Sequence, residues 1–145
     1  MAQEILLQIS EETPVTHKMK HDVESFIWVF CYCVMRKLYV QCQRKDPAVQ
    51  AAAAERKEFR KLFSEAFSQT NLRQIALQRV WASPALDFVQ FGTVGSIIEQ
   101  FMSQTLVNFF KALQVLVERT QGSSTVDLTH ELLLEEINKA IASLA

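Results

Sequence analysis

Phe26-Ile27-Trp28-Val29-Phe30-Cys31-Tyr32-Cys33-Val34-Met35 is an apolar run that contains no charged side chain. Such a run has no polar side, so it is buried on both faces as a strand or all round as a helix. It is longer than a usual strand, contains no Gly or Pro, and continues into Arg36-Lys37-Leu38-Tyr39. We therefore predict a helix from Asp22 to about Gln43 that forms the centre of a helical core.

The charged residues at the ends of this segment fit a helix. Asp22 precedes the run, where its carboxylate can accept hydrogen bonds from the free N–H groups of the first turn. Arg36 and Lys37 lie toward the C-terminal end, where cations complement the helix dipole. A membrane span is the alternative, but it needs about 18 or more apolar residues. Glu24 and Arg36 enclose too few, so we predict no membrane insertion.

The composition predicts one folded, all-α domain that binds no nucleic acid. The chain has 145 residues, enough for a real core, and 49% of them are apolar. Gly and Pro number three each, which disfavours a turn-rich β-sandwich. The net charge of −1 creates no global field for nucleic acid or an anionic membrane. The cations around Arg56 and Arg60 are interleaved with acids, which is typical of a solvated helix face.

The cysteines are Cys31, Cys33 and Cys42. Their number is odd, and the N-terminus has neither the basic start nor the cleavage pattern of a secretory signal. We therefore predict reduced thiols in an intracellular protein, cytoplasmic or nuclear. Cys31 and Cys33 are two residues apart and point to different faces of a helix, which disfavours a metal clamp or a strain-free disulfide. Buried structural thiols are the predicted role of all three.

Apolar spacing and capping signals predict further helices around the central one. Asp46-Pro47 is a helix start, Ser96 and Glu99 form a capping box, and Thr129 caps the last helix. The last helix carries Leu133, Ile137, Ile141 and Leu144 on one face, and the helix after Pro47 has the apolar stripe Phe59, Leu62, Phe63, Ala66 and Phe67. The predicted helices span Met1 to Ile9, Pro47 to Phe67, Thr70 to about Trp81, Ser96 to about Glu118, and Thr129 to Leu144. The predicted connections include the polar residues from Ser10 to Lys20 and a stretch that contains Phe88 and Phe91.

Patterns that indicate catalysis or metal binding are sparse. His17, His21 and Asp22 are a possible metal cluster, but Pro14 and the polar residues around it predict an exposed, non-helical segment. A zinc site also needs four ligands in defined geometry. The chain has no Gly-x-Ser-x-Gly elbow, no Gly-rich phosphate loop and no His-Glu-x-x-His. We predict no catalytic, cofactor-binding or metal-binding residue.

Three segments resemble the fungal-type protein kinase domain family. Met1 to Leu6 is similar to its F-M-A-x-E-L-L, which closes the activation segment. His21 to Val29 is similar to its H-D-L-E-S-F-x-W-V-L, which opens the helix buried in the kinase C-lobe. Leu128 to Leu133 is similar to its C-terminal L-T-H-x-x-L-L. The resemblance implies that 1–145 is one partial kinase domain: 1–21 would end the activation segment and connect it, and 22–145 would be the helical core of the C-lobe.

The resemblance implies scaffolding roles for four residues. Glu4 matches the Glu of the Ala-Pro-Glu motif, which pairs with an Arg and anchors the activation segment. Arg79 is the candidate partner of Glu4, with Arg119 behind it. Asp22 matches the Asp whose carboxylate accepts hydrogen bonds from the backbone of the catalytic loop, and Ser25 matches the Ser three residues later.

The motifs for phosphoryl transfer do not occur in this sequence. The family transfers phosphate from ATP to protein Ser or Thr with a Gly-rich loop, a strand Lys, a His-Arg-Asp and an Asp-Phe-Gly. The resemblance therefore implies a kinase-like fragment, or a truncated product, that is not catalytic alone; ATP and Mg²⁺ are implied only for a full-length member. The alternative is a helical protein–protein interaction module, which binds another chain or self-associates through exposed apolar surface.

Overall fold

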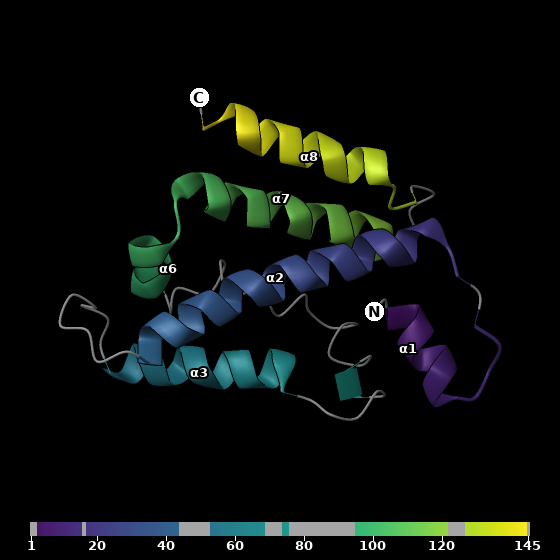
Figure 1. Cartoon of the computed structure of the whole chain (residues 1–145), viewed down its shortest axis with the longest axis horizontal. Helices are drawn as coiled ribbons and strands as arrows, with labels where there is room; N and C mark the ends of the chain where they lie inside the picture. Colours follow the sequence, from purple (N-terminus) through teal and green to yellow (C-terminus); the bar gives the residue numbers. More distant parts are fainter. Residues whose placement is uncertain are drawn as a thin grey trace.

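A computed structural model describes residues 3–15, 17–43, 53–68, 74–75, 95–121 and 127–144. All regular secondary structure in these ranges is helical, which confirms the predicted all-α class for this part of the chain (Figure 1). The predictions on Asp46-Pro47, Arg79, Phe88, Phe91 and most of the helix at 70–81 lie outside the described residues. The helices are α1 (Gln3–Ser10), α2 (Met19–Gln43), α3 (Ala53–Phe67), α6 (Gly95–Phe101), α7 (Gln104–Gln121) and α8 (His130–Ala142).

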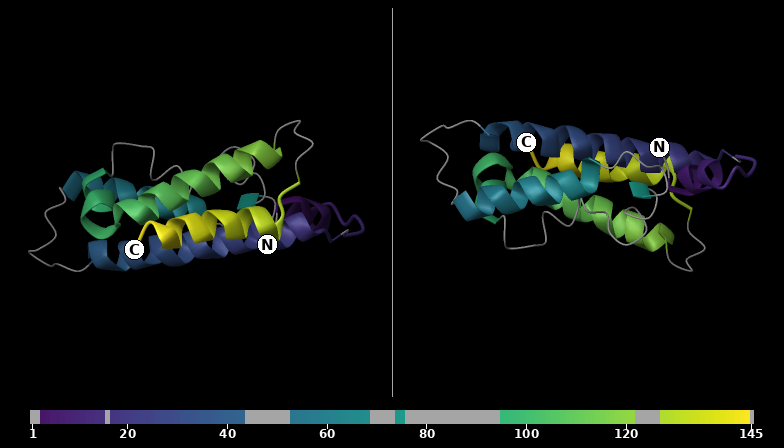
Figure 2. Two further views of the ribbon diagram at one scale, coloured as in Figure 1. Left: turned by 90° about the horizontal axis from the view of Figure 1, so that it is seen from above. Right: turned by 90° about the horizontal axis from the view of Figure 1, so that it is seen from below.

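The longest of these helices, α2, lies in the middle of the molecule (Figure 1). α3 packs on one side of it, and α7 and α8 lie on the other side. α3 and α7 run antiparallel to α2, whereas α8 runs in the same direction as α2. The views in Figure 2 also show α8 following the length of α2, with α7 beside it. Burial against three neighbours makes α2 the centre of the core, as predicted.

The core is built from one face of each packed helix. Phe59 of α3 and Phe110 of α7 are fully buried, and the rest of the predicted α3 stripe is partly buried against the core. Aromatic side chains join α2 to α3: the rings of Tyr39 and Phe63 stack with centroids 4.6 Å apart, and Tyr32 lies edge-on to Phe67 at 5.3 Å. The buried residues of α2 are His21, Val23, Ile27, Trp28, Cys31, Met35, Leu38 and Cys42.

The prediction that α2 is buried all round is wrong. Phe26 is 50% exposed, Val29 is 58% exposed, and Cys33 and Val40 also face outward. The buried residues of α2 recur at helical spacing, so they lie on one face of the helix. The apolar residues of α2, in contrast, occur on all of its faces. Among the described helices, α3, α7 and α8 cover the other side of α2 and leave these positions exposed.

α2 begins at Met19, so the prediction that Asp22 caps it is wrong. His21 caps the helix instead: its Nδ1 accepts a hydrogen bond from the backbone N–H of Lys18 at 3.1 Å, and the imidazole is buried. This bond has the geometry of a capping box, in which a side chain three residues inside the helix binds the N–H of the residue before it. Asp22 lies in the first turn, exposed, with Oδ1 3.1 Å from Nε2 of His17.

Two charged side chains of α3 bind the ends of other helices. Arg60 donates a hydrogen bond to the carbonyl oxygen of Cys42 in the last turn of α2 (3.4 Å), and Glu55 accepts one from the N–H of Ile97 in the first turn of α6 (3.3 Å). A cation therefore lies at a helix C-terminus and an anion at a helix N-terminus, as the helix dipoles favour. The charged face of α3 thus has a structural role in addition to being solvated.

The helix predicted from Ser96 to about Glu118 is two helices, α6 and α7, separated at Met102 and Ser103. Gly95 already belongs to α6, so Ser96 is not the residue before the helix. Ser103 is the cap, because its Oγ accepts a hydrogen bond from the N–H of Leu106 at 3.3 Å. The hydrogen bond between Leu106 and Ser103 competes with helical hydrogen bonds of the backbone, so α6 ends and α7 begins at this point.

Ser103→Ala tests this break. Loss of an N-cap hydroxyl is expected to lower the free energy of unfolding by about 1 kcal/mol. In an uninterrupted helix the same change would be neutral or stabilising, because Ala is the better helix former. Urea denaturation compares the wild type, Ser103→Ala and the control Ser103→Asp, whose carboxylate can still accept the bond; a stabilised Ala variant contradicts the break.

Thr129 caps α8 as predicted, since its Oγ1 accepts a hydrogen bond from the N–H of Leu132 at 3.4 Å. The predicted apolar face of α8 is covered only in part. Leu133 is buried and Ile137 is partly buried against the core, whereas Ile141 is 60% and Leu144 is 69% exposed. The C-terminal end of α8 and the residues just after it therefore present large apolar side chains to solvent.

Candidate functional site: an apolar face on α2 and α8

A groove of about 470 Å³ lies between α2, α7 and the C-terminal half of α8. Its lining is almost entirely apolar; the hydroxyls of Ser103 and Thr105 are the polar side-chain groups in it. A volume of this size matches sites that bind side chains or small apolar groups. The lining residues are Phe26, Phe30, Ser103, Thr105, Leu106, Phe109, Ile137, Ala140, Ile141 and Leu144.

The groove has a packed aromatic floor. Phe30 of α2 meets Phe109 edge-on with ring centroids 5.5 Å apart, and the Phe110 ring lies 5.5 Å from the same side chain. Phe110 is fully buried beneath them. Because the floor is continuous with the core, the position of the groove is fixed by the packing of α7 against α2.

Exposed apolar side chains extend the groove along both helices. On α2, Phe26 and Val29 lie on the outward face, and Cys33, Arg36 and Val40 continue it at alternating spacings of three and four. Leu134, Ile137 and Ile141 of α8, with Leu144 just past its end, have the same spacing, and Ile137 is the partly buried one among them. This is the spacing at which a helix packs along another helix. We call Phe26, Val29, Ile137, Ile141 and Leu144, with the groove between them, the apolar face.

Opposite charges border the apolar face at different ends. Arg36 and Lys37 are exposed in the C-terminal half of α2, where the Arg36 guanidinium reaches the Tyr32 hydroxyl at 3.3 Å. Glu131 and Glu135 are exposed in the N-terminal half of α8. A hydrogen bond from the backbone, together with one from Thr129, lowers the pKa of Glu131.

Glu135 also stays anionic at neutral pH. Its Oε1 lies 2.8 Å from Nζ of Lys139, and the hydrogen bond from that ammonium lowers the pKa of the Glu135 carboxyl. Lys139 binds Glu136 at the same distance. The N-terminal half of α8 therefore carries exposed negative charge at neutral pH.

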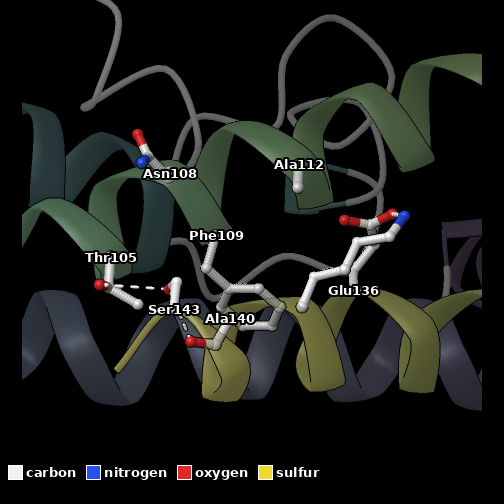
Figure 3. Close-up of a pocket in the computed structure, with 8 residues that line it drawn as sticks. Thr105, Asn108, Phe109, Ala112, Glu136, Ala140 and Ser143 are labelled. Atoms are coloured by element: carbon white, nitrogen blue, oxygen red, sulfur yellow. Dashed lines mark hydrogen bonds and ion pairs between the residues drawn. The ribbon is translucent and has the colours of Figure 1, made fainter. Parts of the chain in front are cut away.

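A smaller pocket of about 200 Å³ lies on the other side of Phe109, between α7 and α8 (Figure 3). Its polar groups have partners: Ser143 Oγ lies 2.7 Å from the carbonyl oxygen of Ala140 and 3.4 Å from Thr105 Oγ1, Lys139 binds Glu136, and Asn108 accepts a hydrogen bond from Gln104. The bond between Ser143 and Thr105 joins the end of α8 to α7, and the others lie within a single helix. We therefore assign this pocket a structural role.

The residues implied by the kinase resemblance do not form a described cluster. Glu4 lies in α1, but its side chain and Arg79 are outside the described residues, so their pairing stays a prediction. Asp22 is exposed and paired with His17, and Ser25 is half-buried in α2. The two roles assigned to Asp22 and Ser25 by the resemblance also stay predictions.

The structure brings His17, His21 and Asp22 together. The two imidazoles meet edge-on with centroids 5.9 Å apart, but Nδ1 of His21 is used by the backbone of Lys18. Among the described residues, no group of three or more His, Cys, Asp or Glu side chains has a geometry that fits a metal ion. The contacts of this cluster are those of a helix start.

The three cysteines have different environments. All are free thiols; Cys31 and Cys42 are buried as predicted, but Cys33 is exposed, which corrects the prediction for that residue. Cys33 lies on the outward face of α2, which none of the described helices covers. Burial raises the pKa of the Cys31 thiol to about 12, and burial also raises that of Cys42 against the opposing effect of Arg60.

Comparison of the chain with models of known protein families, with curated proteins and with solved structures found no match. In the part of the chain that the structure describes, no helix combines the length and apolarity needed to cross a lipid bilayer.

Proposed function

We propose that the chain is a helical protein–protein interaction module and that the apolar face is its docking surface. The observation that carries this proposal is the continuity of the groove with large exposed side chains, among them Phe26, Ile141 and Leu144, on two helices. Contiguous exposed apolar surface of this kind marks interaction sites in folded proteins. Covering it with a partner removes that surface from water at about 25 cal/mol per Å².

The form of the face favours a helix as the partner's binding element. The outward residues of α2 and α8 recur at spacings of three and four, which suits ridges of a second helix. The aromatic side chains Phe26, Phe30 and Phe109 provide the anchors that dominate binding energy at most interfaces. The charged rim of Arg36, Lys37, Glu131 and Glu135 supplies orientation more than affinity.

Site-specific photo-crosslinking tests the docking surface. Val29 is replaced by p-benzoylphenylalanine in the chain expressed in its native cells, and the covalent products are identified by mass spectrometry. The matched control carries the same group at Lys57, which is exposed on α3 away from the face. We expect one defined protein adduct from position 29 and none from position 57. Equal products at both positions, or none at 29, would overturn the proposal.

The kinase resemblance supports a second proposal, that the chain is the C-lobe part of a kinase-like protein. Asp22 favours it: the carboxylate lies in the first turn of the central helix and is exposed, where a catalytic loop supplied by additional chain has room to bind it. The coding sequence before Met1 tests this. An in-frame Gly-rich loop, strand Lys and His-Arg-Asp would support it, and an in-frame stop codon directly upstream would contradict it.

A further inference from the structure

We infer that the occupant of the apolar face is an amphipathic helix of a partner protein that runs antiparallel to α2 and α8. This helix carries acidic side chains in its N-terminal half and basic side chains in its C-terminal half. The inference rests on the proposed docking function and adds the direction and the charge order of the partner. It follows from the directions of three helices and from the charges at the two ends of the face.

The directions of the helices around the groove leave one place in a four-helix bundle open. α2 and α8 run in the same direction, and both line the groove (Figure 1). α7 runs antiparallel to both and contributes to the floor, where Phe109 meets Phe30 of α2. In an up-down-up-down bundle, each helix runs opposite to its neighbours. A helix that lies over the groove opposite α7 completes such a bundle when it runs antiparallel to α2 and α8.

The two ends of the face carry opposite charges. α2 and α8 begin toward the same end of the molecule (Figure 1), so Glu131 and Glu135 of α8 lie toward one end of the face and Arg36 and Lys37 of α2 toward the other. An antiparallel partner begins beside the cations and ends beside the carboxylates. Acidic side chains in its first turns and basic ones in its last turns then meet unlike charges, which fix the orientation of an interface.

The same charge order stabilises the partner helix itself. Acidic side chains are favourable near a helix N-terminus and basic ones near its C-terminus, because they complement the helix dipole. A partner that runs parallel to α2 needs the reverse order to meet unlike charges, and that order opposes its own dipole. The antiparallel direction therefore satisfies the bundle geometry, the charges of the face and the dipole of the partner together.

The groove sets the length and the apolar stripe of the partner. α8 has 13 residues and is about 20 Å long, so about four turns of a partner helix cover it. Apolar side chains that recur at helical spacing over these turns contact Phe26, Ile141 and the ring of Phe109. Grooves of this kind bind amphipathic helices through such a stripe.

Two synthetic peptides of about 18 residues test the inference. They have the same composition and the same apolar stripe, and a hydrocarbon staple on the outer face holds both of them helical. The acid-first peptide carries Glu beside the stripe in its first turns and Lys in its last turns, and the base-first peptide has these exchanged. Isothermal titration calorimetry at low ionic strength measures the dissociation constant of each peptide for the purified chain.

A matched pair of chain variants separates the effect of the charges from the properties of the peptides. The control, Lys61→Glu with Glu65→Lys, exchanges an exposed ion pair on α3 and keeps the net charge. Thermal melts monitored by circular dichroism establish that both variants fold. The exchanged variant swaps the charges at the two ends of the face and also keeps the net charge: Arg36→Glu, Lys37→Glu, Glu131→Lys and Glu135→Lys.

We expect the acid-first peptide to bind the wild type and the α3 control about tenfold more tightly than the base-first peptide does. The exchanged variant should prefer the base-first peptide instead. Because the charges are exposed, the preference should shrink as the salt concentration rises. Equal affinities of the two peptides for the wild type, or an exchanged variant that folds and keeps the wild-type preference, would contradict the inference.

Photo-crosslinking to the wild type measures the direction of the partner without any change in the chain. The acid-first peptide carries p-benzoylphenylalanine at its second residue or at its last residue but one, and mass spectrometry of the digested adducts locates the attachment. We expect the first position to attach within 33–40 of α2 and the second within 130–134 of α8. The reverse assignment means a parallel partner and overturns the inference.

Other outcomes separate this inference from the docking function. Failure of both peptides to bind overturns the inference, and so does a wild-type dimer, measured by sedimentation equilibrium, that Ile141→Glu dissociates, since a second copy then covers the face. An adduct from position 29 with a partner protein leaves the docking function intact in either case. Absence of both peptide binding and an adduct from position 29 overturns the two proposals together.

Discussion

Phe110→Ala is expected to lower the free energy of unfolding by about 3–5 kcal/mol, a large part of the stability of a domain of this size. The Phe110 side chain is fully buried on α7, and its ring packs 5.5 Å from that of Phe30 on α2. Truncation to Ala removes this apolar contact and leaves a cavity that the surrounding helices fill only in part.

The neighbouring ring supplies the matched control. Phe109 packs on the same Phe30 ring but lines the groove and is only partly buried. Phe109→Ala is therefore expected to cost about 1–2 kcal/mol, since less area returns to water. Urea denaturation followed by far-UV circular dichroism measures both variants. Equal losses would mean that α7 is rotated about its axis relative to the structure described above.

The periodicity of the sequence predicted helices whose apolar and charged faces are separated. In α3 the stripe from Phe59 to Phe67 is covered by the core, and in α8 the cap at Thr129 is the observed one. In both segments the local signal and the tertiary packing favour the same structure. The all-α class and the central position of α2 were predictable for this reason.

The sequence was ambiguous where one pattern fits two structures. The run from Phe26 to Met35 is apolar on every side, so its composition does not distinguish the covered face of α2 from the open one. The positions of α3, α7 and α8 decide which face is covered. The cap at Ser103 was missed because the apolar pattern continues across it. The cap formed by His21 was missed because a buried imidazole seldom replaces Glu in a capping box.

The residues of the apolar face were not predictable from the sequence for the same reason. Its existence was expected from the alternative of an interaction module, but its residues were not identified. Ile141 and Leu144 have the spacing of a buried face, and Phe26 belongs to a run predicted to be core. Only the three-dimensional structure shows that α8 contacts α2 in a way that leaves these side chains around an open groove.

The second large effect is a loss of stability at alkaline pH caused by Cys31. Burial raises the pKa of this thiol from 9.0 to about 12, because the thiolate is poorly solvated in the centre of α2. Between these values the unfolded chain releases the proton while the folded chain retains it. The stability that the protonated Cys31 thiol gives the folded chain is therefore fully present below pH 9 and is lost as the pH rises toward 12. The loss is about 1.4 kcal/mol per pH unit, or about 4 kcal/mol in total.

Urea denaturation at intervals from pH 8 to pH 11 measures this loss in the wild type and in Cys31→Ala. Other groups that ionise at alkaline pH are present in both proteins, so the difference between the two slopes isolates Cys31. Val23→Ala is the control, because it leaves a cavity in the same helix and removes no titratable group. We expect this control to retain the wild-type slope and Cys31→Ala to have a shallower one. Identical slopes in all three proteins would show that water reaches Cys31, and that α2 is not buried on this side.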